Sequence, residues 1–172
     1  MLSENIRAFA GHLLAGDAEA VSAVLNDDLL NGPSSFDFKE ENSYHMFIYG
    51  LLYAASADAV SVDVSPGVAA HGVAARGLYT VHSNREAGKG RSDCVLKPTD
   101  KNAAAVVIEF KHLKKDPSGG SAGLMAEAQE GLGQIKEKAY DHDLRREGYT
   151  RIYKYGIAFH GKRCAVAMER EG

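Results

Sequence analysis

The sequence GRSDCVLKPTDKNAAAVVIEFKH, residues 90–112, carries the clearest structural signal in the chain. Two mostly apolar runs, 91–97 and 104–112, flank a short segment of turn-forming residues at 98–102. This pattern predicts an antiparallel β-hairpin. Three charged residues, Asp93, Glu109 and Lys111, lie inside the apolar runs, where an ordinary core strand would carry Val or Leu.

Strand geometry predicts that these charges share one face of the hairpin. Side chains alternate between the two faces of a strand, so Glu109 and Lys111 project together and the even-numbered apolar residues project oppositely. If the turn centres on residue 100 or 101, Asp93 lies opposite residue 107 or Glu109. We therefore expect one face to be all core and the other to collect Asp93, Glu109, Lys111 and Arg91.

Two neighbouring carboxylates repel each other and lose hydration, so they require a compensating positive charge. A divalent cation fits, because Mg²⁺ prefers oxygen ligands and is often held by one or two carboxylates plus waters and phosphate. A lysine beside such a metal can orient the attacking water or neutralise a phosphate. The alternative is a solvent-facing hairpin in which Lys111 simply bridges Asp93 and Glu109. The spacing alone leaves both interpretations open.

Composition restricts the protein class. A chain of 172 residues with 45% hydrophobic residues forms one domain, or one domain with an appendage, around a real core. The charged fraction of 25% and the mean hydropathy of -0.26 are typical of soluble proteins. The net charge of -3 excludes an overall basic character. Contact with nucleic acid would therefore require a local basic patch.

The cysteines and the N-terminus predict a cytoplasmic protein. Cys94 and Cys164 are distant in sequence and lie in apolar runs, so we expect buried free thiols, which suit a reducing compartment. Glu4 and Arg7 interrupt the N-terminal segment, which lacks the pattern of a signal peptide. No run reaches the roughly 18 apolar residues of a membrane span, so no membrane association is expected.

Periodicity along the chain predicts alternating helices and strands. We expect helices at 3–15, 18–30 and 39–57, strands at 78–84, 91–97 and 104–112, and a long helix at 122–147 that Gly148 ends. A closing hairpin turns at Gly161. Residues 60–77 begin with alternating valines and continue as an irregular, glycine-containing segment. The order α-α-α-β-β-β-α-β-β predicts an α/β fold with helices packed on a mixed sheet.

Several segments together resemble the PD-(D/E)XK nuclease superfamily. They are SNREAGKGRSDCVL (83–96), VIEFK (107–111) and the helix AEAQEGLGQIKEKAY (126–140). More narrowly, they resemble the domain found C-terminal to AAA-ATPase-like modules in bacterial and archaeal proteins. SSFDFKEENSYHMFIYGLL (34–52) and YKYGIAFHGKRCAV (153–166) fit the same pattern, so the resemblance covers residues 34–167.

The resemblance implies a restriction-endonuclease-like αβββαβ core in residues 36–172, preceded by a helical appendage in residues 1–35. It also implies that Asp93 and Glu109 bind Mg²⁺, with Mn²⁺ as a substitute, and that Lys111 is the catalytic lysine. Glu41 would join the metal site, and Gln134 would support it. The expected substrate is nucleic acid, specifically DNA.

Two features depart from the family pattern. The first motif reads Arg-Ser-Asp in place of Pro-Asp, and the segment 65–77 is longer than expected between a first helix and a first strand. The sequence also holds no ATPase-like module, which would be a partner in other family members. The alternative function is therefore a catalytically inactive nuclease-fold module that binds or interacts. A homodimer through the N-terminal helices is a further option.

Five additional residues are weaker candidates. His45 lies one helical turn after Glu41, and Lys138 one turn after Gln134, so each pair shares a helix face. His45 would contact phosphate or support the site, although a partly buried structural histidine explains it equally simply. Lys138 would orient the site or belong to an exposed strip. Tyr140 is expected to be a packing residue. The basic residues 114–115 fit either a phosphate-binding loop or a solvated one.

Overall fold

A computed structural model describes residues 2–32, 40–57, 79–87 and 90–172 of the chain. Its elements follow the predicted order, with one additional short helix. They are α1 (Leu2–Ala15), α2 (Ala18–Asn31), α3 (Glu41–Ala57), β1 (Tyr79–Ala87), β2 (Gly90–Pro98), β3 (Ala105–His112), α4 (Ser121–Lys138), α5 (His142–Arg146), β4 (Ile152–His160) and β5 (Arg163–Glu171).

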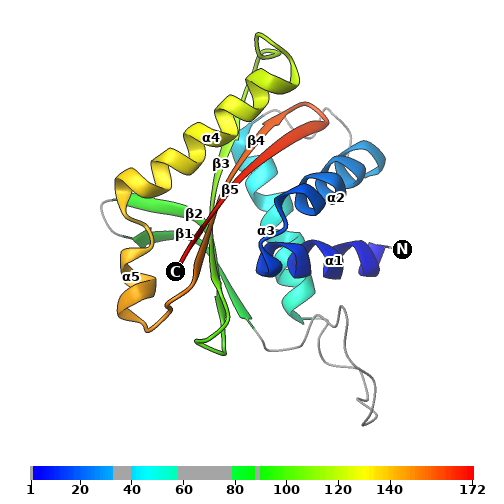
Figure 1. Ribbon diagram of the computed structural model, residues 1–172. Coiled ribbons are helices and arrows are strands. Elements are labelled where there is room, and N and C mark those ends of the chain that lie inside the picture. Colours follow the sequence, from blue (N-terminus) through cyan, green and yellow to red (C-terminus); the bar gives the residue numbers. More distant parts are fainter. Residues whose placement is uncertain (1, 33–39, 58–78, 88–89) are drawn as a thin grey trace.

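The five strands form one mixed sheet in the order β1-β2-β3-β4-β5. Neighbouring strands are antiparallel, except that β3 and β4 run parallel and are connected through α4 and α5. The sheet separates two helical layers, with α1, α2 and α3 on one side and α4 and α5 on the other (Figure 1). The predicted α/β architecture with helices on a mixed sheet is confirmed.

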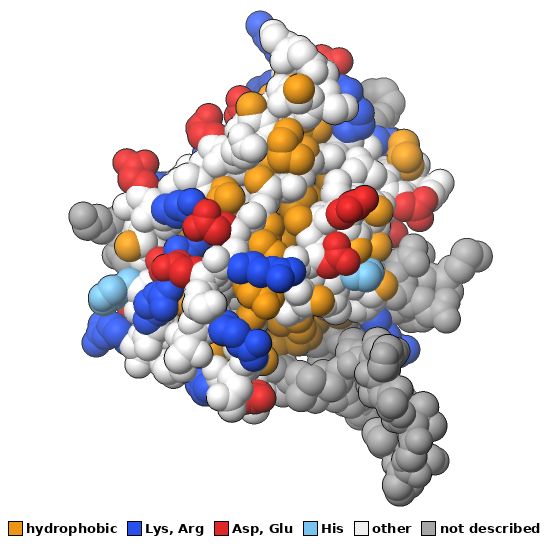
Figure 2. Space-filling model, in the orientation of Figure 1, with side chains coloured by type: hydrophobic (Ala, Val, Ile, Leu, Met, Phe, Trp, Pro, Cys, Tyr) orange, Lys and Arg blue, Asp and Glu red, His pale blue; other side chains and the backbone are white. Residues whose placement is uncertain are grey.

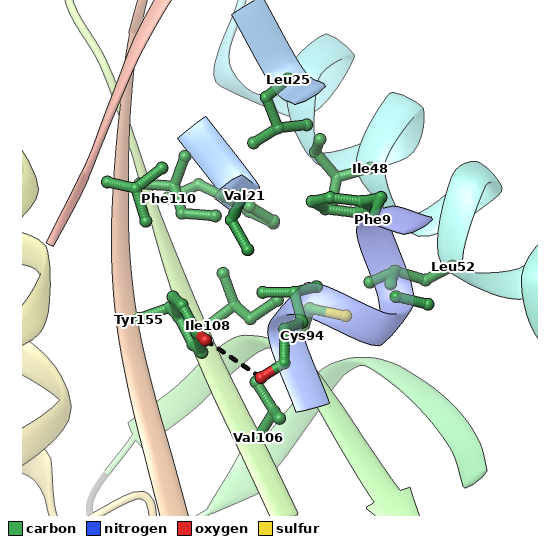
Figure 3. Close-up of a cluster of buried hydrophobic side chains, with 14 of the residues drawn as sticks. Phe9, Val21, Leu25, Ile48, Leu52, Cys94, Val106, Ile108, Phe110 and Tyr155 are labelled. Atoms are coloured by element: carbon green, nitrogen blue, oxygen red, sulfur yellow. Dashed lines mark hydrogen bonds between the residues drawn. The ribbon is translucent and has the colours of Figure 1, made fainter. Parts of the chain in front are cut away.

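The largest core lies between the sheet and the three N-terminal helices. Even-numbered residues of β2 and β3, such as Leu96, Ile108 and Phe110, point into it, as the strand alternation predicts. Figure 3 shows Ile108 and Phe110 facing residues of α1, α2 and α3. Phe9 of α1 and Leu25 of α2 are fully buried in the same cluster. The helices of the predicted appendage thus share a core with α3 and the sheet.

The opposite face of the sheet is also partly core, which corrects the expectation of one apolar and one charged face. Val95 and Val107 are buried there together with Ile135 of α4 and with residues that follow α4, including Tyr140 and Leu144. The charged residues occupy the next positions along the same face. The candidate site therefore lies at the edge of a second hydrophobic cluster, under α4, and not on an open hairpin.

Helix α4 lies unusually close to β4, because the strand presents glycine to it. A Cβ atom added at Gly156 would come within 1.9 Å of the Ala128 carbonyl oxygen and 2.6 Å of the Leu132 nitrogen. Gly156 pairs with Glu109 across the parallel β3–β4 ladder. Consequently, α4 is held at short distance beside the strand position that carries Glu109.

The prediction of one long helix over residues 122–147 is wrong, because the chain turns after Lys138 and a second, short helix follows. Ala139 adopts a left-handed conformation (φ 52°, ψ 47°) that ends α4, and its amide bonds to the Lys136 carbonyl at 3.2 Å. Tyr140 then enters the hydrophobic cluster with 1% exposure, and the short helix α5 follows. Gly148, with φ 97°, follows the end of α5, as expected of a helix-ending glycine.

Buried Lys154 of β4 fixes this turn from the sheet side. Its ammonium lies 3.2 Å from Asp141 Oδ2 and also pairs with Glu171. Burial alone would raise the pKa of Asp141, but the hydrogen bond and charge of Lys154 lower it below its ordinary value. A buried charge without its partner is strongly destabilising, so this ion pair holds the chain in place after α4.

The first two strands are longer than predicted. β1 continues to Ala87 and β2 begins at Gly90, whereas the sequence predicted a turn from residue 85 to residue 90. The irregular segment 60–77, the loop before α3 and the boundary at residue 35 lie outside the described residues. Cys94 and Cys164 are buried and free, as predicted. In the described part of the chain, no helix has the length and apolar character needed to cross a bilayer.

The contact of α4 with Gly156 makes a stability prediction. We expect Gly156→Ala to lower the free energy of unfolding by about 3 kcal/mol or more, because the added methyl group meets helix backbone that cannot yield. Gly133→Ala is the matched control on α4. No atom lies within 4 Å of the Cβ position at Gly133, so alanine there should stabilise by about 0.5–1 kcal/mol.

Urea unfolding of both variants measures the two effects. Equal stabilities for Gly156→Ala and the wild type would contradict the close packing of α4 on β4.

Candidate active site

The β2–β3 register brings Asp93 and Glu109 together. Val95 pairs with Val107 and Cys94 with Ile108, so the next position of the ladder places Asp93 opposite Glu109. Asp93 Oδ2 accepts a hydrogen bond from the Phe110 amide at 2.8 Å. The carboxylate of Asp93 thus bonds to the backbone of β3 where the regular pairing of the two strands ends.

Glu109 is almost fully buried, with 4% of its surface exposed. Its Oε1 accepts a hydrogen bond from the Gln134 side-chain amide. Its Oε2 is buried and has no hydrogen-bond partner among the described residues. An unsatisfied buried carboxylate oxygen is costly and calls for an explanation, such as an ion that the protein holds there.

The electrostatic environment of Glu109 is unfavourable to its charged form. Burial, and then the neighbouring charge of Asp93, raises the pKa of Glu109 to about 8. Glu41 adds to the effect, while the cations Lys138 and Lys111 oppose it without cancelling it. Between pH 4.5 and 8 the folded protein therefore favours a protonated Glu109, unless a further positive charge is present.

Asp93 experiences the same conflict. Burial is the main cause that raises the pKa of Asp93, and the charge of Glu41 contributes. The Phe110 amide and the charges of His45 and Lys111 lower it, but less. Two adjacent carboxylates with raised pKa values, one of them with a free oxygen, form a donor set that suits a hard divalent cation.

Gln134 connects Glu109 to Lys111. While its amide nitrogen donates to Glu109, its Oε1 accepts a hydrogen bond from Lys111 Nζ at 2.7 Å. Lys111 also lies 3.8 Å from the exposed carboxylate of Glu130. The amide of Gln134 therefore orients both side chains, and the predicted trio and Gln134 lie together on one face under α4.

Glu41 is the first residue of α3 and is exposed. Its charge affects both Asp93 and Glu109, so it lies in the neighbourhood of the pair. Among the described residues, however, no three His, Cys, Asp or Glu side chains are grouped closely enough to hold a metal by themselves. Protein ligation by two carboxylates is sufficient for Mg²⁺, which usually retains several waters.

His45 is a buried residue of α3, the helix that covers the face of the sheet opposite α4. Its exposure is 5%, its Nε2 lies 2.9 Å from Ser83 Oγ, and its ring centroid lies 5.5 Å from that of Phe110. This environment explains His45 as a packed, hydrogen-bonded histidine whose charge supports Asp93. The side chain of Arg91, expected on the same face as Asp93, is not among those described.

The sequence left Lys138 open between a residue that orients the site and a member of an exposed strip. Of the cations that lower the pKa of Glu109, Lys138 has the larger effect and Lys111 the smaller. The sequence signal was its position four residues after Gln134, on the same helix face. That signal is weak alone, because many surface helices carry a lysine at this spacing.

Comparison with known proteins identifies a family that the sequence matches. Residues 69–169, more than half of the 172-residue chain, match a family model described as the PD-(D/E)XK nuclease superfamily. The matched region contains Asp93, Glu109, Lys111 and Gln134. A search of curated proteins gave no match.

The raised pKa of Glu109 makes a prediction about stability and pH in metal-free buffer. The folded state binds this proton more tightly than the unfolded state, so wild-type stability falls as pH rises from about 4.5 to about 8. Gln cannot ionise. We therefore expect Glu109→Gln to exceed the wild type in free energy of unfolding by about 1–3 kcal/mol above pH 8, with the difference shrinking towards pH 4.5.

Chemical denaturation in EDTA across this range measures the difference, with the exposed Glu137→Gln of α4 as the control. A Glu109→Gln variant that is less stable than the wild type at every pH would contradict the electrostatic description.

Proposed function

Because the chain belongs to the PD-(D/E)XK nuclease superfamily, we propose that it is a metal-dependent nuclease that hydrolyses phosphodiester bonds of DNA. The observation that carries the proposal is the buried pair Asp93 and Glu109, in which Glu109 Oε2 has no partner among the described residues. A binding module without chemistry has no need to bury an unsatisfied carboxylate beside a second one.

Asp93 and Glu109 would hold Mg²⁺, for which Mn²⁺ can substitute, and Glu41 would contribute from the start of α3. When bound there, the cation would lower the pKa of a water molecule and neutralise charge on the scissile phosphate. Asp93 Oδ2 accepts a hydrogen bond from the Phe110 amide, so Oδ1 would be the oxygen that binds the cation. In Glu109, Oε2 is the oxygen that Gln134 leaves free.

Lys111 would act on the reacting groups. Its ammonium projects on the same face as Glu109, two residues further along β3, and is bound by Gln134. From there it would orient the attacking water and donate a hydrogen bond to a phosphate oxygen whose negative charge grows in the transition state. Gln134 would prevent Lys111 from collapsing into a direct ion pair with Glu109, so that both groups stay available.

A catalytically inactive nuclease-fold binding module is the second candidate. The net charge of -3 favours it, as does the face shown in Figure 2, where acidic and basic side chains intermingle around α5 and the end of β5. A nuclease can nonetheless bind DNA through a few local cations and a metal, so mixed surface charge alone does not decide between the two.

Cleavage assays test the proposed activity. With Mg²⁺ or Mn²⁺, we expect the wild type to cleave plasmid, linear or branched DNA, and Glu109→Ala and Lys111→Ala each to lose at least about 100-fold in rate. Lys136→Gln and Glu137→Gln, at exposed positions of α4, are the matched controls and should cleave like the wild type. A folded wild type without cleavage, or active Glu109→Ala and Lys111→Ala variants, would refute the enzymatic function.

Metal binding separates the two candidates independently of cleavage. We expect calorimetric titration with Mg²⁺ or Mn²⁺ to show binding to the wild type that Asp93→Asn weakens by about tenfold or more, because one anionic ligand is lost. Binding of neither cation by the wild type would favour the inactive module.

A further inference from the structure

Lys138 ends α4 and Tyr140 lies in the turn that follows it, close to the candidate site. Neither residue has a role in the function proposed above. The turn is tightly constrained. Ala139 is the only non-glycine residue with a positive φ among the described residues. The left-handed conformation costs an L-residue on the order of 1–2 kcal/mol, so the surroundings must enforce it. Lys154 contributes by binding Asp141, two residues after Ala139, at 3.2 Å.

Tyr140 lies next to the site in the hydrophobic layer. It belongs to the buried cluster that contains Val95 and Val107, which form the strand pair adjacent to Asp93 and Glu109 on the same face. Only 1% of Tyr140 is exposed, yet its hydroxyl oxygen is buried without a partner of ordinary hydrogen-bond geometry among the described residues. Buried tyrosine hydroxyls normally have a partner, so this oxygen is available to receive one.

Lys138 is the nearby donor. Its ammonium lies 5.7 Å from the centroid of the Tyr140 ring. Its pKa is raised above the ordinary value, first by interaction with the Tyr140 hydroxyl and then by the charges of Glu109 and Asp93. Lys138 is also one helical turn after Gln134, which contacts Glu109 directly. The helix register thus directs Lys138 towards the side of α4 that faces the site.

The charge of Lys138 is not committed to an ion pair. Among the described residues it has no carboxylate within 4 Å, whereas Lys136 pairs with Glu169 and Lys154 with Asp141. Figure 2 shows basic and acidic side chains intermingled on this side of the molecule. An unpaired ammonium beside two carboxylates, held near a buried hydroxyl, is suited to bind an anion that the site receives.

We propose that Lys138 binds a backbone phosphate adjacent to the scissile one, and that Tyr140 positions Lys138 by accepting a hydrogen bond from its ammonium. This inference rests on the proposed nuclease function and adds a substrate-binding residue to it. Lys111 then donates a hydrogen bond to the scissile phosphate, and Lys138 binds the neighbouring phosphate. Tyr140 is too deeply buried to reach DNA and acts only through Lys138.

DNA binding in a cleavage-deficient background tests the proposal. Lys111→Ala keeps the DNA intact in Mg²⁺, and fluorescence anisotropy with a labelled duplex gives the affinity over a series of salt concentrations. We expect Lys138→Gln to weaken binding about tenfold and to reduce the slope of log K against log salt by about 1, because one phosphate contact is lost. Lys138→Arg should retain affinity within about threefold.

Lys136→Gln is the matched control. It removes the same charge from the same helix, at a position already paired with Glu169, and should change affinity less than about twofold. Mg²⁺ titration of Lys138→Gln excludes an indirect effect, because removing a nearby cation can only favour metal binding. Weaker DNA binding would therefore report the lost phosphate contact.

Tyr140→Phe tests the positioning role. In the Lys111→Ala background with Lys138 intact, we expect Tyr140→Phe to lower DNA affinity about threefold. When Lys138→Gln is also present, Tyr140→Phe should cause no further loss, since the hydroxyl acts through the lysine. Equal DNA affinities of the Lys138→Gln and Lys136→Gln variants would overturn this inference and leave the proposed nuclease function untouched. Additive effects of Tyr140→Phe and Lys138→Gln on DNA affinity would do the same. An absence of DNA binding by the background variant, and of cleavage by the wild type, would instead refute the proposed function.

Discussion

Helix α4 rests on the backbone of β4 at Gly156, where even a methyl group would meet the Ala128 carbonyl oxygen at 1.9 Å. Gly156 is the ladder partner of Glu109, so this close helix–sheet contact lies directly beside the candidate site. Because α4 lies so close to the sheet, the side chain of Gln134 reaches both Glu109 and Lys111. The arrangement of the site is thus a consequence of packing, since any larger residue at position 156 would lift α4 away.

The electrostatics of the site follow from the same burial. α4 covers the face that carries the charged residues, removes Glu109 from water and raises its pKa to about 8. Lys111 and Lys138 oppose this effect without cancelling it. A protein that keeps two carboxylates in such a position gives up stability near neutral pH. A divalent cation bound between the two carboxylates would offset this cost, and would link the stability of the fold to the function proposed for it.

Much of this arrangement could be predicted from the sequence. The alternation of side chains along the strands predicted that Asp93, Glu109 and Lys111 share one face. The order of helices and strands, taken from the spacing of apolar residues, predicted the mixed sheet. The end of α4 could not be predicted, because alanine is the strongest helix former and nothing local at Ala139 indicates a break. The break depends on tertiary contacts, namely the burial of Tyr140 and the Lys154–Asp141 ion pair.

The same limit applied to the charged face and to Lys138. The sequence predicted a face of charges, but the second hydrophobic cluster on that face needs α4 and α5 to fold over it. The effect of the Lys138 charge on the pKa of Glu109 depends on where the helix ends, which the sequence does not indicate. Without the turn at Ala139, the residue would be one more surface lysine.

The most direct measurement of the central claim is the anomalous difference density of a crystal soaked in Mn²⁺. We predict a peak between Asp93 and Glu109, in contact with Glu109 Oε2. A well-ordered crystal without density there, or with manganese bound only elsewhere, would contradict the account.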